Sequence, residues 1–373
     1  MRKTFQYRIY PTHAQERLLR QMLEECRWLY NETLATRKRA WEEQQQTLGL
    51  YDTQVFLPGW KEQRPALKRV HSQVLQNVQV RVDLAFKAFF RRVKAGEQPG
   101  YPRFRGYGRY DSLTYPQYGN GARLEGRTLI LSKLGSVKVV LHRPVEGQIK
   151  TVTLRRASTG KWYVSFSVET GPQPLPELPA AVGVDVGLSS FATLSTGEKI
   201  ANPRFFRQDQ RALARAQRKL SRAQKGTPER ARRRKAVARV HERIAFRRWN
   251  FAHQEARKLV DRFGVIAVED LSITHMLKNH CLAKSITDAA WNQFVLTLMR
   301  KAEDAGRQVV QIDPRNTSKR CSRCGQLVEK DVSIRVHQCP VCGLVMDRDE
   351  NAAVNMLAVG LYSLGRTPRS PRL

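Results

Sequence analysis

Acidic residues are scarce in this 373-residue sequence, which contains 33 Asp or Glu against 66 Lys or Arg and so has a formal net charge of +33. Solubility alone does not require an excess of this size. Compaction of such a chain stores electrostatic repulsion that bound phosphates would relieve, so nucleic acid is the leading candidate for a partner. The hydrophobic content of 41% is sufficient to build cores and excludes a wholly disordered chain.

Long apolar runs are also missing from the sequence. No stretch reaches the roughly 18 apolar residues that a membrane-spanning helix needs, so neither a bilayer span nor a membrane partner is expected. The segment from Met1 to Thr4 continues into mixed polar residues, and we therefore expect no signal peptide. A reducing, cytoplasmic location follows from these two absences.

Cysteine is sparse, but four of the six cysteines form the pattern Cys-x2-Cys, 14 residues, Cys-x2-Cys. This spacing brings two pairs of thiolates together, as a tetrahedral Zn²⁺ ion requires, and a site closed by four thiolates is structural. A disulfide framework is disfavoured in a cytosolic protein. His337 is the alternative ligand, although four cysteines suffice. The predicted zinc ligands are Cys321, Cys324, Cys339 and Cys342.

The first half of the chain predicts a few basic helices and a small barrel. Residues 4–9 alternate like a strand, and Thr12 with Gln15 forms a capping-box pattern that begins a helix in which Cys26 packs on the apolar face. A second helix is expected over 74–93. Short β-rich runs from 101 to about 170, including 161–168, predict the barrel. Arg103 and Arg105 lie among aromatic residues and suit phosphate contact beside stacked bases.

The second half predicts an α/β arrangement after a proline-rich linker over 172–179. Apolar runs at 181–186, 190–194 and 197–200 have short connections and should form antiparallel strands. Long helical stretches follow, and alternation of helices with strands then completes the α/β order. The later elements are expected as a strand over 265–268, a helix over 289–305, a strand over 309–312 and a closing helix over 350–364.

Several acidic residues lie within or directly beside the predicted apolar strands and the closing helix. Asp185 lies inside the apolar run 181–186, Glu269 follows the run 265–268, and Asp347 and Asp349 precede the closing helix. An ionised carboxylate in such surroundings is disfavoured unless a cation accompanies it. Hard cations such as Mg²⁺ prefer oxygen ligands, and two of them about 3.5 to 4 Å apart can support in-line phosphodiester hydrolysis. The acids therefore predict a site for two Mg²⁺ ions that acts on phosphodiesters.

The most basic part of the chain, residues 204–258, contains 19 Lys or Arg against four acids. Gly226 and Pro228 interrupt its helical pattern, which predicts a helical hairpin. Few acids are available for ion pairs, so we expect the exposed cations to contact phosphates. The predicted contacts are Arg211, Arg215, Arg218 and Lys219 on the first arm and Arg232, Arg233, Arg234, Lys235 and Arg239 on the second.

Together these motifs resemble the transposon-encoded TnpB (OrfB-type) RNA-guided nucleases, relatives of the type V CRISPR effectors. The resemblance covers nearly the whole chain and is most specific in the second half. The matching segments there are 183–188, 268–271, 313–318 leading into Cys321, and 347–355. Similar segments in the first half are 10–12, the helix with Phe86, Phe89 and Phe90, 100–105, and 161–168.

The resemblance implies an α+β multidomain fold. A small β-barrel of the wedge type would comprise 1–10 and 97–178, with a helical recognition bundle inserted over 11–96. An RNase H-like (RuvC) α/β domain would comprise 179–316 and 347–364, with the basic hairpin at 203–258 and a zinc ribbon inserted over 317–346. Residues 365–373 would form a disordered tail.

The resemblance also implies an activity. The protein would bind a guide RNA from its own transposon end and cleave both strands of target DNA beside a short transposon-associated motif. Asp185, Glu269 and Asp349 would be the catalytic Mg²⁺ ligands, with Asp347 the alternative to Asp349. Two other functions stay open: a recombinase that uses the same carboxylates for strand transfer, and a catalytically inactive RNA-guided protein that represses transcription.

Overall fold

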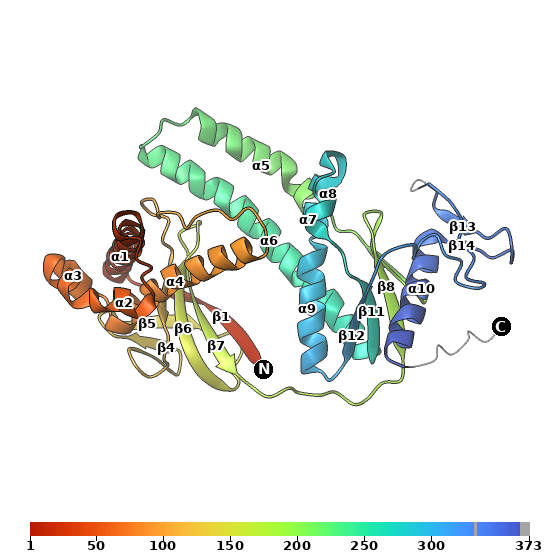
Figure 1. Ribbon diagram of the computed structural model, residues 1–373, viewed down its shortest axis with the longest axis horizontal. Coiled ribbons are helices and arrows are strands. Elements are labelled where there is room, and N and C mark those ends of the chain that lie inside the picture. The colour runs from red at the N-terminus through yellow and green to blue at the C-terminus, as the bar shows by residue number, and fades with distance from the viewer. Residues whose placement is uncertain (332–333, 366–373) are drawn as a thin grey trace. The chain divides into compact units, whose positions relative to one another are not determined.

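The structure of the protein is a computed structural model that describes residues 1–331 and 334–365 (Figure 1). It divides into two compact units, Met1–Thr170 and Gly171–Leu373. The expected disordered tail lies outside the described residues, apart from Gly365. None of the helices in the described part of the chain combines the length and apolar character that a bilayer crossing requires.

The first unit is built around a seven-stranded antiparallel sheet with the order β2-β6-β7-β1-β5-β4-β3. Side chains alternate between buried and less buried along β7, as the sequence predicts, because one face of the sheet lines the core. The sheet is nearly closed and barrel-like, which confirms the expected small barrel. Its strands are β1 (Arg2–Tyr10), β2 (Ser112–Tyr115), β3 (Ala122–Glu125), β4 (Thr128–Leu131), β5 (Gly135–Val140), β6 (Gln148–Arg156) and β7 (Trp162–Glu169).

Two long helices accompany this sheet, and both are predicted by the sequence. In the capping box of α1 (His13–Gln44), the Gln15 amide donates to Thr12 Oγ1 at 3.2 Å and the Thr12 amide donates to Gln15 Oε1 at 3.0 Å. Cys26 is fully buried in the core, as expected. The second long helix is α4 (Ser72–Lys94). Three short helical segments between them are not predicted: α2 (Leu50–Val55), α3 (Leu57–Gln63) and η1 (Pro65–Arg69).

The second unit contains a five-stranded mixed sheet with the order β10-β9-β8-β11-β12. The first three strands pair antiparallel and the last three parallel, as expected for short and long connections respectively. The strands are β8 (Ala181–Val186), β9 (Ser190–Leu194), β10 (Lys199–Ala201), β11 (Val265–Glu269) and β12 (Gln308–Ile312). β10 begins two residues later than predicted, because residues 194–197 form the tight turn that closes the β9–β10 hairpin.

Helices cover both faces of this sheet (Figure 1). On one face α9 (Trp291–Asp304) and the end of α6 (Pro228–Arg262) pack with Val182 and Val184, and on the other face Ala352 and Met356 of α10 (Arg348–Ser363) pack with Ala267. α6 and α5 (Phe205–Arg222) form the predicted helical hairpin. α6 extends past the expected end at 258 because Leu259 and Val260 are buried in the core.

The remaining elements of the second unit are small. α7 (Ile273–Met276) and α8 (His280–Ala289) precede α9, and the sequence does not predict them. α9 begins at Trp291 because Ala290 adopts the left-handed backbone conformation, with φ +57°. A two-stranded ribbon of β13 (Val336–Gln338) and β14 (Val345–Asp347) leads directly into α10.

Candidate active site and metal centre

Asp185 lies on β8, between two neighbouring strands. Val184 pairs with Val268 of β11 in parallel register, and Asp185 itself pairs with Thr193 of β9. Burial raises the pKa of Asp185 well above its usual value, and the negative charges of Glu269 and Asp349 raise it further. An acid in this position therefore needs a cation if it is to be ionised.

Glu269 is the last residue of β11 and lies one step beyond the Val268–Val184 pair, at the same end of the sheet as Asp185. Burial raises its pKa to about 7, the hydrogen bond from Thr317 opposes this rise, and the charge of Asp349 adds to it. Thr317 Oγ1 donates to Glu269 Oε1 at 3.3 Å. The parallel register of β8 and β11 thus brings together two acids that are far apart in the sequence.

Asp349 comes from the first turn of α10 and differs in its contacts from Asp347. Asp347 is the N-cap: its Oδ1 accepts the amide of Asp349 at 2.9 Å, and its Oδ2 accepts Lys199 Nζ at 2.7 Å. The charge of Asp349 acts on both Asp185 and Glu269, and its carboxylate accepts Arg348 Nη2 at 2.9 Å, with Arg335 Nη1 3.8 Å away. Asp347 is therefore occupied by helix capping, which favours Asp349 as the third member of the cluster.

Close packing of backbone against backbone sets the distance between β8 and α10. A Cβ atom on Gly183 would lie 1.9 Å from the carbonyl oxygen of Ala353, which no real structure tolerates. Farther along α10, a Cβ atom on Gly360 would lie 2.7 Å from Ala267 Cβ. The two glycines let the helix lie directly on the sheet, and this places Asp349 beside Asp185.

The donor set of this acid cluster fits Mg²⁺. Asp185, Glu269 and Asp349 offer only carboxylate oxygens, which hard divalent cations prefer. Burial, and then the charges of neighbouring acids, raise the pKa values of Asp185 and Glu269, and a bound cation would favour their ionised forms. Sequence patterns predict all three acids, and the structure brings them to one end of the sheet.

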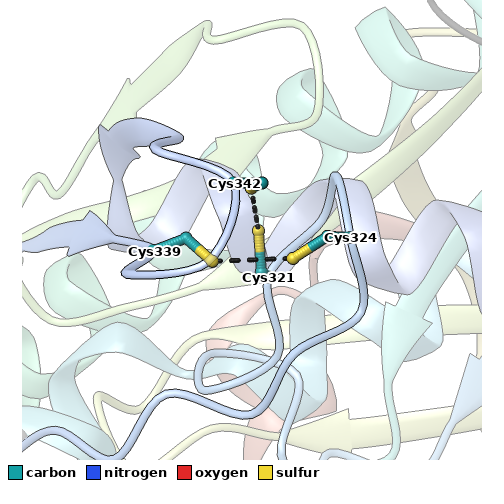
Figure 2. Close-up of side chains that lie close together, drawn as sticks. All are labelled: Cys321, Cys324, Cys339 and Cys342. Atoms are coloured by element: carbon teal, nitrogen blue, oxygen red, sulfur yellow. Dashed lines mark hydrogen bonds between the residues drawn. The ribbon is translucent and has the colours of Figure 1, made fainter.

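The four predicted cysteines form a second ligand cluster (Figure 2). Their Sγ atoms all lie within 4.8 Å of one another, and Cys321 lies 3.5 Å from Cys342, as Cys324 does from Cys339. The amide of Gly325 donates to Cys321 O and that of Gly343 to Cys339 O, so the two halves have the same knuckle geometry. The donor set fits a structural, tetrahedral Zn²⁺ ion.

His337 is not one of these ligands in the described structure. It is fully buried, and its Nδ1 contacts Lys330 Nζ. The prediction that His337 is a neighbour of the site rather than a ligand agrees with this arrangement.

Two buried asparagines connect the cysteine cluster to α10, and the sequence gives no role for them beyond membership of the 347–355 motif. Asn351 Oδ1 accepts the amide of Ser322 at 2.9 Å, and its Nδ2 donates to Arg320 O at 2.7 Å. Asn355 Nδ2 donates to Thr317 O at 2.8 Å and to Arg320 O at 2.7 Å. The helix that carries Asp349 therefore holds the segment that leads into Cys321 and that supplies Thr317 to Glu269.

The predicted phosphate-contacting cations lie in two separate regions. Arg103 and Arg105 are exposed on a loop of the first unit, where Asn31 binds the backbone of Arg105 and the Arg105 guanidinium lies over Tyr30. The others lie on the hairpin of the second unit. Arg211, Arg215, Arg218, Lys219, Arg232, Arg234 and Arg239 are exposed there, and Arg233 and Lys235 are half-buried.

Comparisons with known proteins agree with this geometry. Residues 165–280 match a family described as "Probable transposase", 291–356 match a "Cas12f1-like, TNB domain", and 1–46 match a "Helix-turn-helix domain". In this structure residues 1–46 form β1 and the single continuous helix α1, and not two helices joined by a turn.

Curated relatives cover almost the whole chain. The chain is 38% identical to a protein of Streptomyces pristinaespiralis named "Putative RNA-guided DNA endonuclease", over 97% of this chain and 90% of the relative. It is 31% identical to InsQ of Escherichia coli K12, which bears the same description, over 96% of this chain and 92% of that relative. The fold resembles that of Cas12f1 in a solved complex with guide RNA and target DNA, with a TM-score of 0.61, 14% identity, and coverage of 95% of this chain and 98% of that chain. With 38% identity along nearly its full length, the chain belongs to the TnpB (OrfB-type) family of transposon-encoded proteins, relatives of the type V CRISPR effectors.

Proposed function

We propose that the protein is an RNA-guided DNA endonuclease of a transposable element, which cleaves double-stranded target DNA beside a short transposon-associated motif. The observation that carries this proposal is the convergence of Asp185, Glu269 and Asp349 from β8, β11 and α10 at one end of a sheet. The names of the relatives support the same activity.

The proposed domain organisation follows the sequence expectation. The strand order of the second unit, which is 3-2-1-4-5 when its strands are numbered along the chain, with the second strand antiparallel, supports an RNase H-like (RuvC) nuclease domain over 179–316 and 347–364. A zinc ribbon would occupy 317–346. In the first unit, a wedge-type barrel over 1–10 and 97–178 would hold a helical recognition insert over 11–96.

In this proposal Asp185, Glu269 and Asp349 hold two Mg²⁺ ions, and Cys321, Cys324, Cys339 and Cys342 hold one Zn²⁺ ion. Bound Mg²⁺ would stabilise charge on the attacking and leaving oxygens of the phosphodiester. The chain's own part is positional. Thr317 donates to the carboxylate of Glu269, and Arg348 donates to that of Asp349.

The partners in this proposal are a guide RNA from the transposon end and a double-stranded DNA target. Base pairing would select the target, while protein cations contact the backbones. The exposed arginines of the α5–α6 hairpin and Arg103 and Arg105 of the first unit would supply these contacts. Such contacts are largely independent of sequence and fall with rising salt.

A cleavage assay tests the proposal. The protein is purified with the RNA that accompanies it, that RNA is sequenced, and a plasmid carrying a matching target is incubated with the complex and Mg²⁺. We expect linear product from the parental protein, and a loss of roughly 10³-fold or more in rate for Asp185→Ala or Glu269→Ala, because each removes ligands worth several kcal/mol of transition-state stabilisation.

The products also separate the alternatives. Joined strands in place of cut ends would indicate a recombinase, and guided binding without any cut would indicate a repressor. Either variant cutting at the parental rate would show that the assigned acids are not the active site, provided that both variants retain the RNA.

A further inference from the structure

A polar pocket of about 360 Å³ opens in the second unit beside the acid cluster. Its lining includes Leu188 and Ser189 of the turn that follows β8, the strand of Asp185, and also Arg335, whose Nη1 lies 3.8 Å from Asp349. The pocket therefore shares one side chain with the proposed catalytic site. Its volume is in the range of cavities that bind small molecules and exceeds that of a lone phosphate.

The charge of the lining points to an anionic ligand. Arg204 and Arg207 line the pocket, both are exposed, and neither guanidinium group has an acidic partner among the described residues. Asp288 is the acid in the described lining, and its charge is already compensated. It is buried, accepts the amides of Phe206 at 2.8 Å and Arg207 at 3.2 Å, and pairs with Arg248 at 2.9 Å. The pocket is therefore cationic.

Neighbouring side chains hold both arginines in place. Arg204 has φ +49° and ψ +47°, a left-handed conformation that is strained for a residue with a side chain. Asn202 fixes it there: Oδ1 accepts the Arg204 amide at 3.2 Å, while Nδ2 donates to Leu188 O at 3.1 Å. Arg207 Nη2 donates to Ser285 Oγ at 2.8 Å. Strain that the surrounding structure maintains is typical of functional sites.

We propose that this pocket is a subsite for a backbone phosphate of the nucleic-acid strand that enters the acid cluster, with Arg204 and Arg207 as its phosphate ligands. This inference rests on the proposed nuclease function. Guanidinium groups suit phosphate because they donate several hydrogen bonds in a planar fork. The link through Asn202 ties the position of Arg204 to the turn after Asp185, so the phosphate and the acids would be held at a fixed spacing.

Binding of single-stranded DNA tests the subsite without cleavage. Asp185→Ala protein loaded with its guide RNA is titrated with a short fluorescent oligonucleotide, with and without Arg204→Gln and Arg207→Gln together. We expect the pair to weaken binding by roughly tenfold or more, as loss of charge-assisted contacts does. The slope of log Kd against log salt should fall by about 0.7 for each arginine. Arg300→Gln, an exposed arginine of α9, is the matched control and should change neither quantity.

An oligonucleotide with one uncharged methylphosphonate linkage makes the test independent of mutant folding. The uncharged linkage is moved along the strand in a series of oligonucleotides. At one position it should weaken binding to the protein that retains Arg204 and Arg207, and at that position it should have no further effect on the double variant. Equal affinity of the double variant, or equal losses in both proteins at every position, would overturn the subsite. Failure of the parental protein to cut matched DNA would instead overturn the proposed function, and the binding arms would still decide whether the pocket holds phosphate.

Discussion

The two ligand clusters of the second unit differ in how far the chain must fold to assemble them. The four cysteines lie within one 22-residue stretch and form two equivalent knuckles, with all four Sγ atoms within 4.8 Å of one another. The three acids come from β8, β11 and α10, and burial and their mutual repulsion raise the pKa values of Asp185 and Glu269. The cysteine cluster assembles from residues that are close in the sequence. The acid cluster is unfavourable without a cation and depends on tertiary contacts of the whole unit.

This comparison predicts that removal of a cysteine ligand has the largest effect on stability. Cys339→Ser should abolish stoichiometric zinc, because a structural site needs all four ligands and its binding energy is part of the folding energy, on the order of 10 kcal/mol in small zinc modules. Elemental analysis and thermal unfolding measure both effects. Cys281→Ser, an exposed cysteine outside the cluster, is the control. A full zinc content in Cys339→Ser would contradict the assignment.

Replacement of Gly183 should have the next largest effect on stability, and of the two clusters it should disturb only the acids. In Gly183→Ala the new Cβ would overlap Ala353 O, so α10 must move off β8 and carry Asp349 away from Asp185. We expect a loss of about 1–3 kcal/mol or more in unfolding free energy, a much larger loss of cutting, and an unchanged zinc content. Chemical denaturation, plasmid cleavage and elemental analysis measure the three.

Gly171→Ala is the matched control for this change, because no atom lies within 4 Å of a Cβ built there. Parental cutting by Gly183→Ala would show that the contact between β8 and α10 does not position the acids.

The same contrast explains what the sequence could and could not predict. Spacing alone specifies the zinc ligands, and the apolar runs that contain Asp185 and precede Glu269 specify two strands that each carry an acid. That both acids lie at the same end of the sheet follows from the parallel register of β8 and β11. The roles of Asn351 and Asn355 escape such reasoning, because their partners are backbone groups on another segment. The short helices α7 and α8 escape it as well, since four and ten residues are too few to show a clear helical period. The position of α8 also depends on a distant residue, because the amide of Phe206 donates to Asp288.

A smaller effect of opposite sign is expected when an acid is neutralised. At pH 8 and without divalent cations, Glu269→Gln should raise the free energy of unfolding by roughly 1–3 kcal/mol, because it removes a charge that burial and Asp349 disfavour, while Gln can still accept from Thr317. Mg²⁺ should stabilise the parental protein and do so less for the variant. Differential scanning calorimetry measures both changes.

Glu303→Gln, an exposed acid on α9, should leave the melting temperature unchanged with or without Mg²⁺. If Glu269→Gln destabilises the metal-free protein instead, the acids are not a repulsive cluster, and the contrast with the cysteines fails.

Loss of an asparagine that joins the two clusters should have a similarly small effect on stability, and it shows whether the clusters work together. Asn355→Ala leaves the carbonyl oxygen of Thr317 without its side-chain donor, at a cost of about 1–3 kcal/mol, while Arg320 O keeps the donor of Asn351. Zinc should remain bound, because the four thiols assemble locally. Cutting should fall, because Thr317 would no longer be held against Glu269. Asn250→Ala, at an exposed position on α6, is the control. Normal cutting by a destabilised Asn355→Ala protein would mean that the zinc cluster only stabilises the fold. Reduced cutting with full zinc content would make Asn355 a positioning residue that couples the cysteine cluster to the acid cluster.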